Sequence, residues 1–138
     1  MNSNNETTVH GVIIAEVIFD SSWQAAGIGF RGASEPHHII LRALNVDIHV
    51  RLSDGGGHAT LMGQVLTRSG DGAAETAIVH LLANGKRVNS AKPDHLGEFR
   101  FQDVPSEGLS LQVDLSSLTL IGSLRTPAPS NGERVIGG

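Results

Sequence analysis

The stretch "DHLGEFRFQDVPSEGLSLQVDL", residues 94–115, contains two runs of alternating apolar and polar side chains, each preceded by a glycine. The apolar positions of these runs are Phe99, Phe101, Leu109, Leu111 and Val113. A period of two is typical of strands that are buried on one face. Gly97 favours a turn before the first run, and Pro105 has no backbone N–H to donate within a central strand. We therefore expect two successive strands here, with these apolar side chains facing the core.

The same alternation occurs in "NVDIHVRLS", residues 45–53. One face would carry Val46, Ile48, Val50 and Leu52, and the other Asp47, His49 and Arg51. Further along, Gly63 interrupts a strand-like run and indicates a bulge or close packing. The dipeptide Asn84-Gly85 predicts a tight hairpin, because both residues tolerate a positive φ. Between Val46 and Leu124 we count about seven short strands, a number typical of a β-sandwich.

The length of 138 residues suits one domain with one core. We expect a single β-sandwich domain at residues 9–125, in which 45–125 form the central part and 9–44 add N-terminal strands or a loop. Residues 1–8 and 126–138 are polar or rich in Pro and Gly, so flexible tails are expected at both ends. The predicted fold class is all-β, a sandwich of about seven to nine strands.

The N-terminal part leaves more than one interpretation open. Val9–Asp20 is rich in β-branched residues and favours a strand, although a short helix would also fit. Ser21–Pro36 is typical of a loop, and His37–Leu44 favours an additional edge strand. Residues 9–44 could therefore hold a strand, a helix or a loose arm.

Composition limits the classes of partner. Ten Lys and Arg against fourteen Asp and Glu give a formal net charge of −4, and the basic residues are scattered along the chain. No basic stretch favours binding to nucleic acid. The single Trp23 and the absence of Tyr disfavour a carbohydrate-binding sandwich, because sugars stack on exposed aromatic rings.

The chain has no cysteine, which excludes disulfides and thiolate sites. Its first residues lack the charge and cleavage pattern of a secretory signal, and no apolar run is long enough to span a membrane. We therefore expect a cytoplasmic protein that does not bind membranes.

The series "LMGQVLTRSGDGAAETAIVHLLANGKRVNSAKPDHLGEFRFQDVPSEGLSLQVDL" resembles the carboxypeptidase regulatory-like domain, a transthyretin-like (prealbumin-like) sandwich. The matching features are Gly63-Gln64-Val65 in a strand, Ala77 to Leu82 as the next strand, Gly97-x-Phe99-x-Phe101, and Val104-Pro105 ahead of Leu109 to Leu115. The resemblance covers roughly residues 60 to 116. It implies an Ig-like or prealbumin-like sandwich, usually an accessory module, and here a small stand-alone bacterial protein.

Two functions follow from the resemblance. Some small bacterial members occur near caspase-like peptidase genes, which implies a regulatory partner or substrate of such a signalling system, with Arg125 to Arg134 as a docking or cleavable segment. The fold also includes hydroxyisourate hydrolase, which ends in Tyr-Arg-Gly-Ser. This chain has no Tyr and ends in "SNGERVIGG", so it departs from that signature.

Histidines are the most abundant chemically reactive side chains. They are His10, His37, His38, His49, His58, His80 and His95. No His-x-His pattern occurs, and Asp47 with His49 is the only short-range coupling, so solvated or structural histidines are favoured over a metal site.

Serines and glycine-rich loops carry no stronger signal. No serine lies in Gly-x-Ser-x-Gly, and the loops at Asp54–His58 and Ser69–Gly72 lack the spaced oxygen donors of a calcium site. We expect no catalytic, metal-binding or cofactor-binding residue.

The residues favour a non-enzymatic module that binds a protein partner through a sheet face or an edge strand. The expected interaction surface comprises Asp47, His49, Arg51, Gly55 and Gly72. The peptidase-system function is the alternative, and a carbohydrate- or metal-binding sandwich is less favoured.

Overall fold

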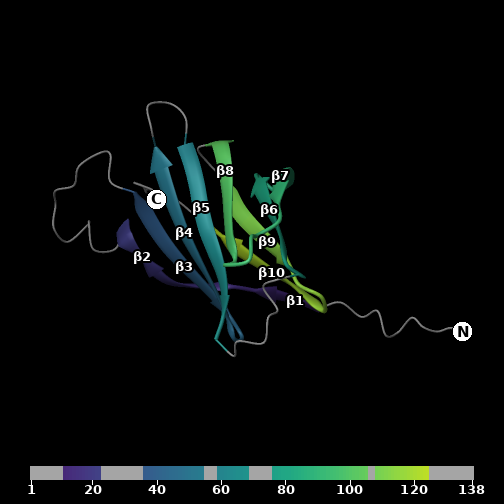
Figure 1. Ribbon diagram of the computed structural model, residues 1–138. Coiled ribbons are helices and arrows are strands. Elements are labelled where there is room, and N and C mark those ends of the chain that lie inside the picture. The colour runs from purple at the N-terminus through teal and green to yellow at the C-terminus, as the bar shows by residue number, and fades with distance from the viewer. Residues whose placement is uncertain (1–10, 23–35, 55–58, 69–75, 106–107, 125–138) are drawn as a thin grey trace, which may run out of the picture.

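The computed structural model of the chain describes residues 11–22, 36–54, 59–68, 76–105 and 108–124. These residues form ten strands in two five-stranded sheets, which confirms the predicted all-β sandwich (Figure 1). The strands are β1 (Gly11–Ile14), β2 (Glu16–Asp20), β3 (His37–Ala43), β4 (Val46–Asp54), β5 (Ala59–Thr67), β6 (Ile78–Ala83), β7 (Lys86–Ala91), β8 (Glu98–Val104), β9 (Leu109–Asp114) and β10 (Leu118–Ser123). The predicted tails at residues 1–8 and 126–138 lie outside the described residues.

One sheet has the strand order β2-β3-β4-β5-β8 and the other β1-β10-β9-β6-β7. Successive strands β2 to β5 form an antiparallel meander, whereas β8 and β9 belong to different sheets. The parallel pairing of β1 with β10 is the exception to the antiparallel order of the neighbouring strands. The chain therefore crosses between the sheets several times and holds them together as one sandwich.

The core lies between the two sheets and follows the predicted alternation. On β4, Val46, Ile48 and Val50 are buried, and the five apolar residues of the stretch at 94–115 are at most 6% exposed. Gly63 provides the predicted close packing, because a Cβ there would lie 2.2 Å from Phe99 Cζ. Its missing side chain leaves the space that the Phe99 ring occupies.

The N-terminal strand is split between the two sheets. β1 pairs with β10, and β2 pairs with β3 in the other sheet. Ala15 lies between the two strands, is buried, and donates its N–H to the Ile121 carbonyl at 2.8 Å. The expected strand in Val9–Asp20 is confirmed for residues 11–14 and 16–20. The expectation that His37–Leu44 forms an edge strand is wrong, because β2 covers that side of β3.

Two further predictions concern the hairpin between β6 and β7 and the end of β8. Asn84 and Gly85 have φ values of 53° and 83°, which confirms the predicted hairpin between β6 and β7. The register then shifts between Leu81 and Leu82, so that Val88 is an extra residue on β7. Pro105 follows the last residue of β8, as predicted.

Candidate functional site

The outer face of the β2-β3-β4-β5-β8 sheet carries three of the five predicted surface residues. Asp47, His49 and Arg51 lie on β4 and point away from the core residues of the same strand. Gly55 and Gly72 lie outside the described residues. The structure thus places the predicted surface on one sheet face and leaves its two loop positions undescribed.

The strand register brings four side chains into one line across this face. They are His38 on β3, Arg51 on β4, Met62 on β5 and Arg100 on β8. We call these four residues the basic row. The row contains two fixed positive charges, one titratable imidazole and one exposed thioether, and no acidic side chain.

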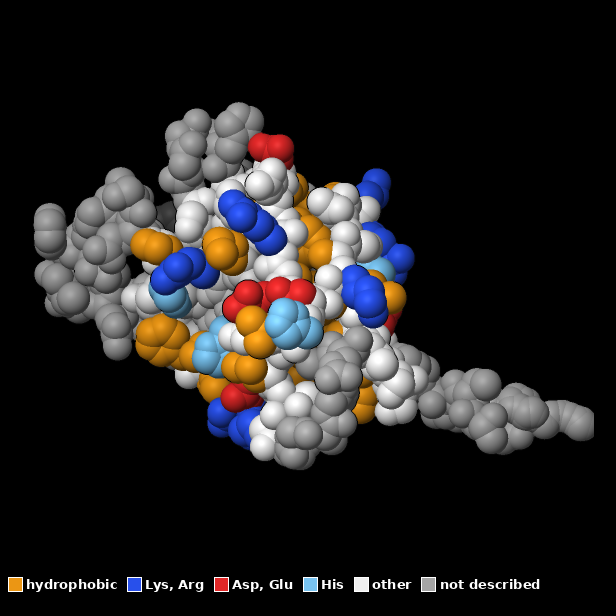
Figure 2. Space-filling model, viewed as in Figure 1, with side chains coloured by type: hydrophobic (Ala, Val, Ile, Leu, Met, Phe, Trp, Pro, Cys, Tyr) orange, Lys and Arg blue, Asp and Glu red, His pale blue; other side chains and the backbone are white. Residues whose placement is uncertain are grey.

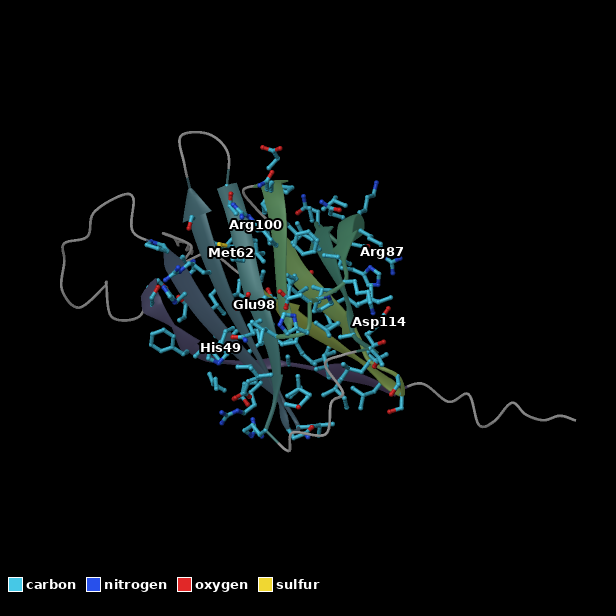
Figure 3. The ribbon with its side chains drawn as sticks, in the orientation of Figure 1. His49, Met62, Arg87, Glu98, Arg100 and Asp114 are labelled. Carbon is cyan, nitrogen blue, oxygen red and sulfur yellow. The ribbon has the colours of Figure 1, made fainter. Side chains whose placement is uncertain are left out.

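A second cross-strand line of side chains lies two residues away from the basic row on each strand. It contains Ile40, His49, Gln64 and Glu98. Figure 3 shows His49, Met62, Glu98 and Arg100 on this face, whereas Arg87 and Asp114 lie over the other sheet. Gln64 Nε2 donates to the Leu96 carbonyl at 2.9 Å, which fixes the turn before β8 against β5.

The surroundings of His38 in the basic row lower its pKa. Burial and then the positive charge of Arg51 lower the pKa of His38 below its ordinary value, with smaller contributions from His37 and His49. Arg51 Nε lies 3.4 Å from His38 Nε2 and donates toward the unprotonated ring nitrogen. Burial and the neighbouring guanidinium group therefore both oppose protonation of His38.

Two acidic side chains, Asp94 and Glu98, lie beside the row but are not part of its line. Asp94 Oδ1 accepts the N–H groups of Leu96 and Glu98, each at 2.9 Å, and the pKa of Asp94 is lowered mainly by the Glu98 N–H. Asp94 therefore stabilises the turn before β8, while Glu98 belongs to the neighbouring line. Neither has a described ion pair with Arg51 or Arg100.

An open hollow of about 640 Å³ lies over this part of the sheet. Its lining includes the cationic side chains of Arg51, Lys92 and Arg100, the acidic side chains of Asp94 and Glu98, and the uncharged Met62 and Gln64. Figure 2 shows Lys and Arg side chains around a central group of Asp, Glu and His side chains on this face. A volume of this size suits a few side chains of a bound segment.

Asp47, one of the predicted surface residues, has several ion-pair partners within the protein. Its carboxylate accepts hydrogen bonds from Arg42 Nε at 2.8 Å, from Arg42 Nη2 at 3.0 Å and from Arg68 Nη1 at 2.6 Å. The Arg42 hydrogen bond is the largest cause of the lowered pKa of Asp47. Asp47 is 8% exposed, so it is occupied by internal ion pairs and contributes little open surface.

A second polar cluster lies on the outer face of the other sheet. His80 Nδ1 lies 2.6 Å from Ser90 Oγ, and His80 Nε2 lies 3.0 Å from Asp114 Oδ2. Asp114 Oδ1 also accepts hydrogen bonds from Gln112 Nε2 at 3.0 Å and Thr119 Oγ1 at 2.9 Å. Four strands, β7, β6, β9 and β10, therefore meet in one hydrogen-bonded network.

Sequence reasoning missed this cluster because of the bulge at Val88. A regular two-residue hairpin at Asn84-Gly85 would pair His80 with Asn89, and Ser90 would then point to the opposite face. The extra residue shifts the pairing by one, so that His80 lies opposite Ser90. No pattern in the sequence marks that shift.

A third cluster lies where β2 meets β3. Asp20 Oδ1 accepts hydrogen bonds from the Ser22 N–H and hydroxyl groups and lies 2.5 Å from His37 Nε2. Burial raises the pKa of Asp20, but the hydrogen bonds from Ser22 and His37 outweigh it and lower the pKa overall. This arrangement stabilises the end of β2.

The histidines do not gather into a metal site in the part of the chain that the structure describes. No group of three or more His, Cys, Asp or Glu side chains there could hold a metal ion. His10 and His58, Trp23, the loops at 55–58 and 69–72, and the segment at 125–134 lie outside the described residues.

No known protein family, curated protein or solved structure matches the chain. Within the described residues, no helix has the length and apolar character needed to cross a membrane.

Proposed function

We propose that the protein is a non-enzymatic β-sandwich module that binds an acidic segment of a partner protein along the basic row. The single observation that carries this proposal is the alignment of His38, Arg51 and Arg100 in one cross-strand line without an acidic side chain. The cytoplasmic location and the likeness to carboxypeptidase regulatory-like domains are part of the same proposal.

Arg51 and Arg100 lie on either side of Met62 in this line, and His38 lies beside Arg51, so the line gathers basic side chains in a chain with a net charge of −4. An anionic segment would neutralise Arg51 and Arg100 and would favour protonation of His38. Complementary charge of this kind speeds association and selects the partner. The basic row therefore favours carboxylate-bearing partners over neutral ones.

Apolar contacts on the same face add affinity to the charge attraction. Met62 is exposed in the middle of the basic row, and Ile40 lies half-buried in the neighbouring line. A thioether side chain adapts its shape to different apolar partners. The segment that fits best is therefore short and extended, with acidic side chains that flank one apolar side chain.

The test is a titration of the full chain into a fluorescent peptide that contains Glu and Asp around one Leu, followed by anisotropy. We expect saturable binding that weakens as salt is raised, because exposed charges are screened. The double variant Arg51→Glu/Arg100→Glu should weaken binding by about tenfold or more.

Arg87→Glu is the matched control. Arg87 is an exposed arginine on β7, in the other sheet, and its reversal changes the net charge without touching the basic row (Figure 3). The proposal is wrong if Arg87→Glu weakens binding as much as each row substitution does, or if a peptide with Lys in place of the acids binds equally well.

A further inference from the structure

Ser90, His80 and Asp114 form a continuous hydrogen-bonded series on the outer face of the second sheet. The two distances are 2.6 Å from Ser90 Oγ to His80 Nδ1 and 3.0 Å from His80 Nε2 to Asp114 Oδ2. The side chains come from the neighbouring strands β7, β6 and β9, so the sheet pairing itself sets these distances. A hydroxyl, an imidazole and a carboxylate in this order can activate a serine for nucleophilic attack.

The carboxylate determines which ring nitrogen of His80 carries the proton. Burial opposes ionisation of Asp114, but hydrogen bonds from Gln112, Thr119 and His80 outweigh it and lower the pKa of Asp114. An ionised carboxylate only accepts hydrogen bonds, so His80 Nε2 donates to it. In the neutral ring, Nδ1 then presents its lone pair to the Ser90 hydroxyl. The base that Ser90 needs is therefore already oriented.

Exposure differs between the base and the nucleophile. His80 is 7% exposed, whereas Ser90 is exposed on the edge strand β7. A molecule in solution can reach the hydroxyl while the ring beneath it stays shielded from water. The Ser90 N–H donates to Asn89 Oδ1 at 2.8 Å, which fixes the Asn89 side chain beside the hydroxyl.

We propose that Ser90 is an activated nucleophile that accepts acyl groups from small activated esters. The Oγ of Ser90 forms a bond to the ester carbonyl carbon, and its proton passes to His80 Nδ1. The tetrahedral adduct then breaks its bond to the leaving oxygen, which takes the proton from His80 and departs as an alcohol. Asp114 acts as a positioning residue that holds the ring and stabilises its protonated form.

A compact ester is the substrate class because it can reach an exposed edge-strand serine without displacing core residues. This reaction is independent of the binding function proposed above, because it uses the other sheet. It gives acyl-Ser90 and the free alcohol as products.

The test treats the full chain with a fluorophosphonate probe and locates the label by intact mass and peptide mapping. The probe forms a phosphorus bond to Oγ, fluoride leaves, and the serine proton passes to His80. We expect one label per molecule, at Ser90, and none in Ser90→Ala. Ser117, an exposed serine in the turn between β9 and β10, serves as the internal reference and should stay unlabelled.

Asp114→Asn is the second variant, because the amide keeps the size of the carboxylate while it can donate to His80 Nε2 and reverse the tautomer. Labelling of Ser90 should slow by about 100-fold or more, because Nδ1 of His80 then no longer presents its lone pair to the hydroxyl. A merely structural network does not predict this loss of reactivity. Labelling of Ser90 no faster than that of Ser117, or at the wild-type rate in Asp114→Asn, would overturn the proposal.

Discussion

The two outer faces of the sandwich differ in how their polar side chains are paired. On the β2-β3-β4-β5-β8 sheet, Arg51 and Arg100 lie in a row without acids, beside a histidine whose pKa is lowered. On the other sheet, His80 is nearly buried and both its ring nitrogens have partners. The paired groups of the second sheet stabilise the fold and orient Ser90, whereas Arg51 and Arg100 of the first sheet remain available to a partner.

The contrast also exists within the first face. Asp47 lies on the same strand as Arg51, yet its carboxylate is bound to Arg42 and Arg68. At this end of the face the two guanidinium groups share one carboxylate, whereas Arg51 and Arg100 have no described carboxylate partner. This difference along a single sheet explains why the binding proposal rests on the basic row and not on Asp47.

The largest expected difference between the faces concerns two histidines. His80→Ala removes a buried ring and leaves Asp114 and Ser90 without their shared partner, so the free energy of unfolding should fall by about 3 kcal/mol. His49→Ala removes an exposed side chain of the other face and should change it by less than about 0.5 kcal/mol. Urea denaturation of both variants measures the two values, and equal losses would contradict the contrast.

The second prediction concerns the core that both faces share. Gly63→Ala places a Cβ against the Phe99 ring, whose nearest atom lies 2.2 Å away, so the unfolding free energy should fall by about 2 kcal/mol. Gly11→Ala is the matched control, because nothing lies within 4 Å of a Cβ there. Thermal unfolding followed by circular dichroism compares them. A stable Gly63→Ala would show that Phe99 can move away freely.

Acid unfolding gives a smaller, pH-dependent test. The pKa values of Asp47 and Asp114 are lowered in the folded state. Each carboxylate therefore stabilises the fold at pH values above its pKa in the unfolded chain, which is about 4. This contribution is lost as the pH falls through the lower pKa of the folded state. Unfolding free energy should therefore fall between about pH 5 and about pH 2. Asp47→Asn and Asp114→Asn should each flatten that dependence, and an unchanged slope would contradict the assigned hydrogen bonds.

Much of the fold could be predicted from the sequence because it rests on local patterns. The alternation in residues 94–115, the Asn84-Gly85 hairpin and the space at Gly63 all have the predicted structural role. Each depends on side-chain period or backbone freedom within a few residues, which a single sequence records.

The candidate sites depend on register and could be predicted only in part. The outward direction of His49 and Arg51 follows from alternation on β4, but their alignment with Met62 and Arg100 requires the pairing of β5 with β8, which are far apart in the chain. The network of His80 depends on the bulge at Val88, and the division of the N-terminal strand at Ala15 depends on two sheets at once.

The most direct test of binding at the basic row is an NMR titration of the isotope-labelled full chain with the acidic peptide. The titration identifies the backbone amides whose chemical shifts change. Binding at the basic row predicts that the largest shifts occur on β3, β4, β5 and β8 around His38, Arg51, Met62 and Arg100, and that β7 around Arg87 stays unchanged. Shifts concentrated on the edge strands β1 or β7, or no shifts at saturating peptide, would contradict the proposed binding face.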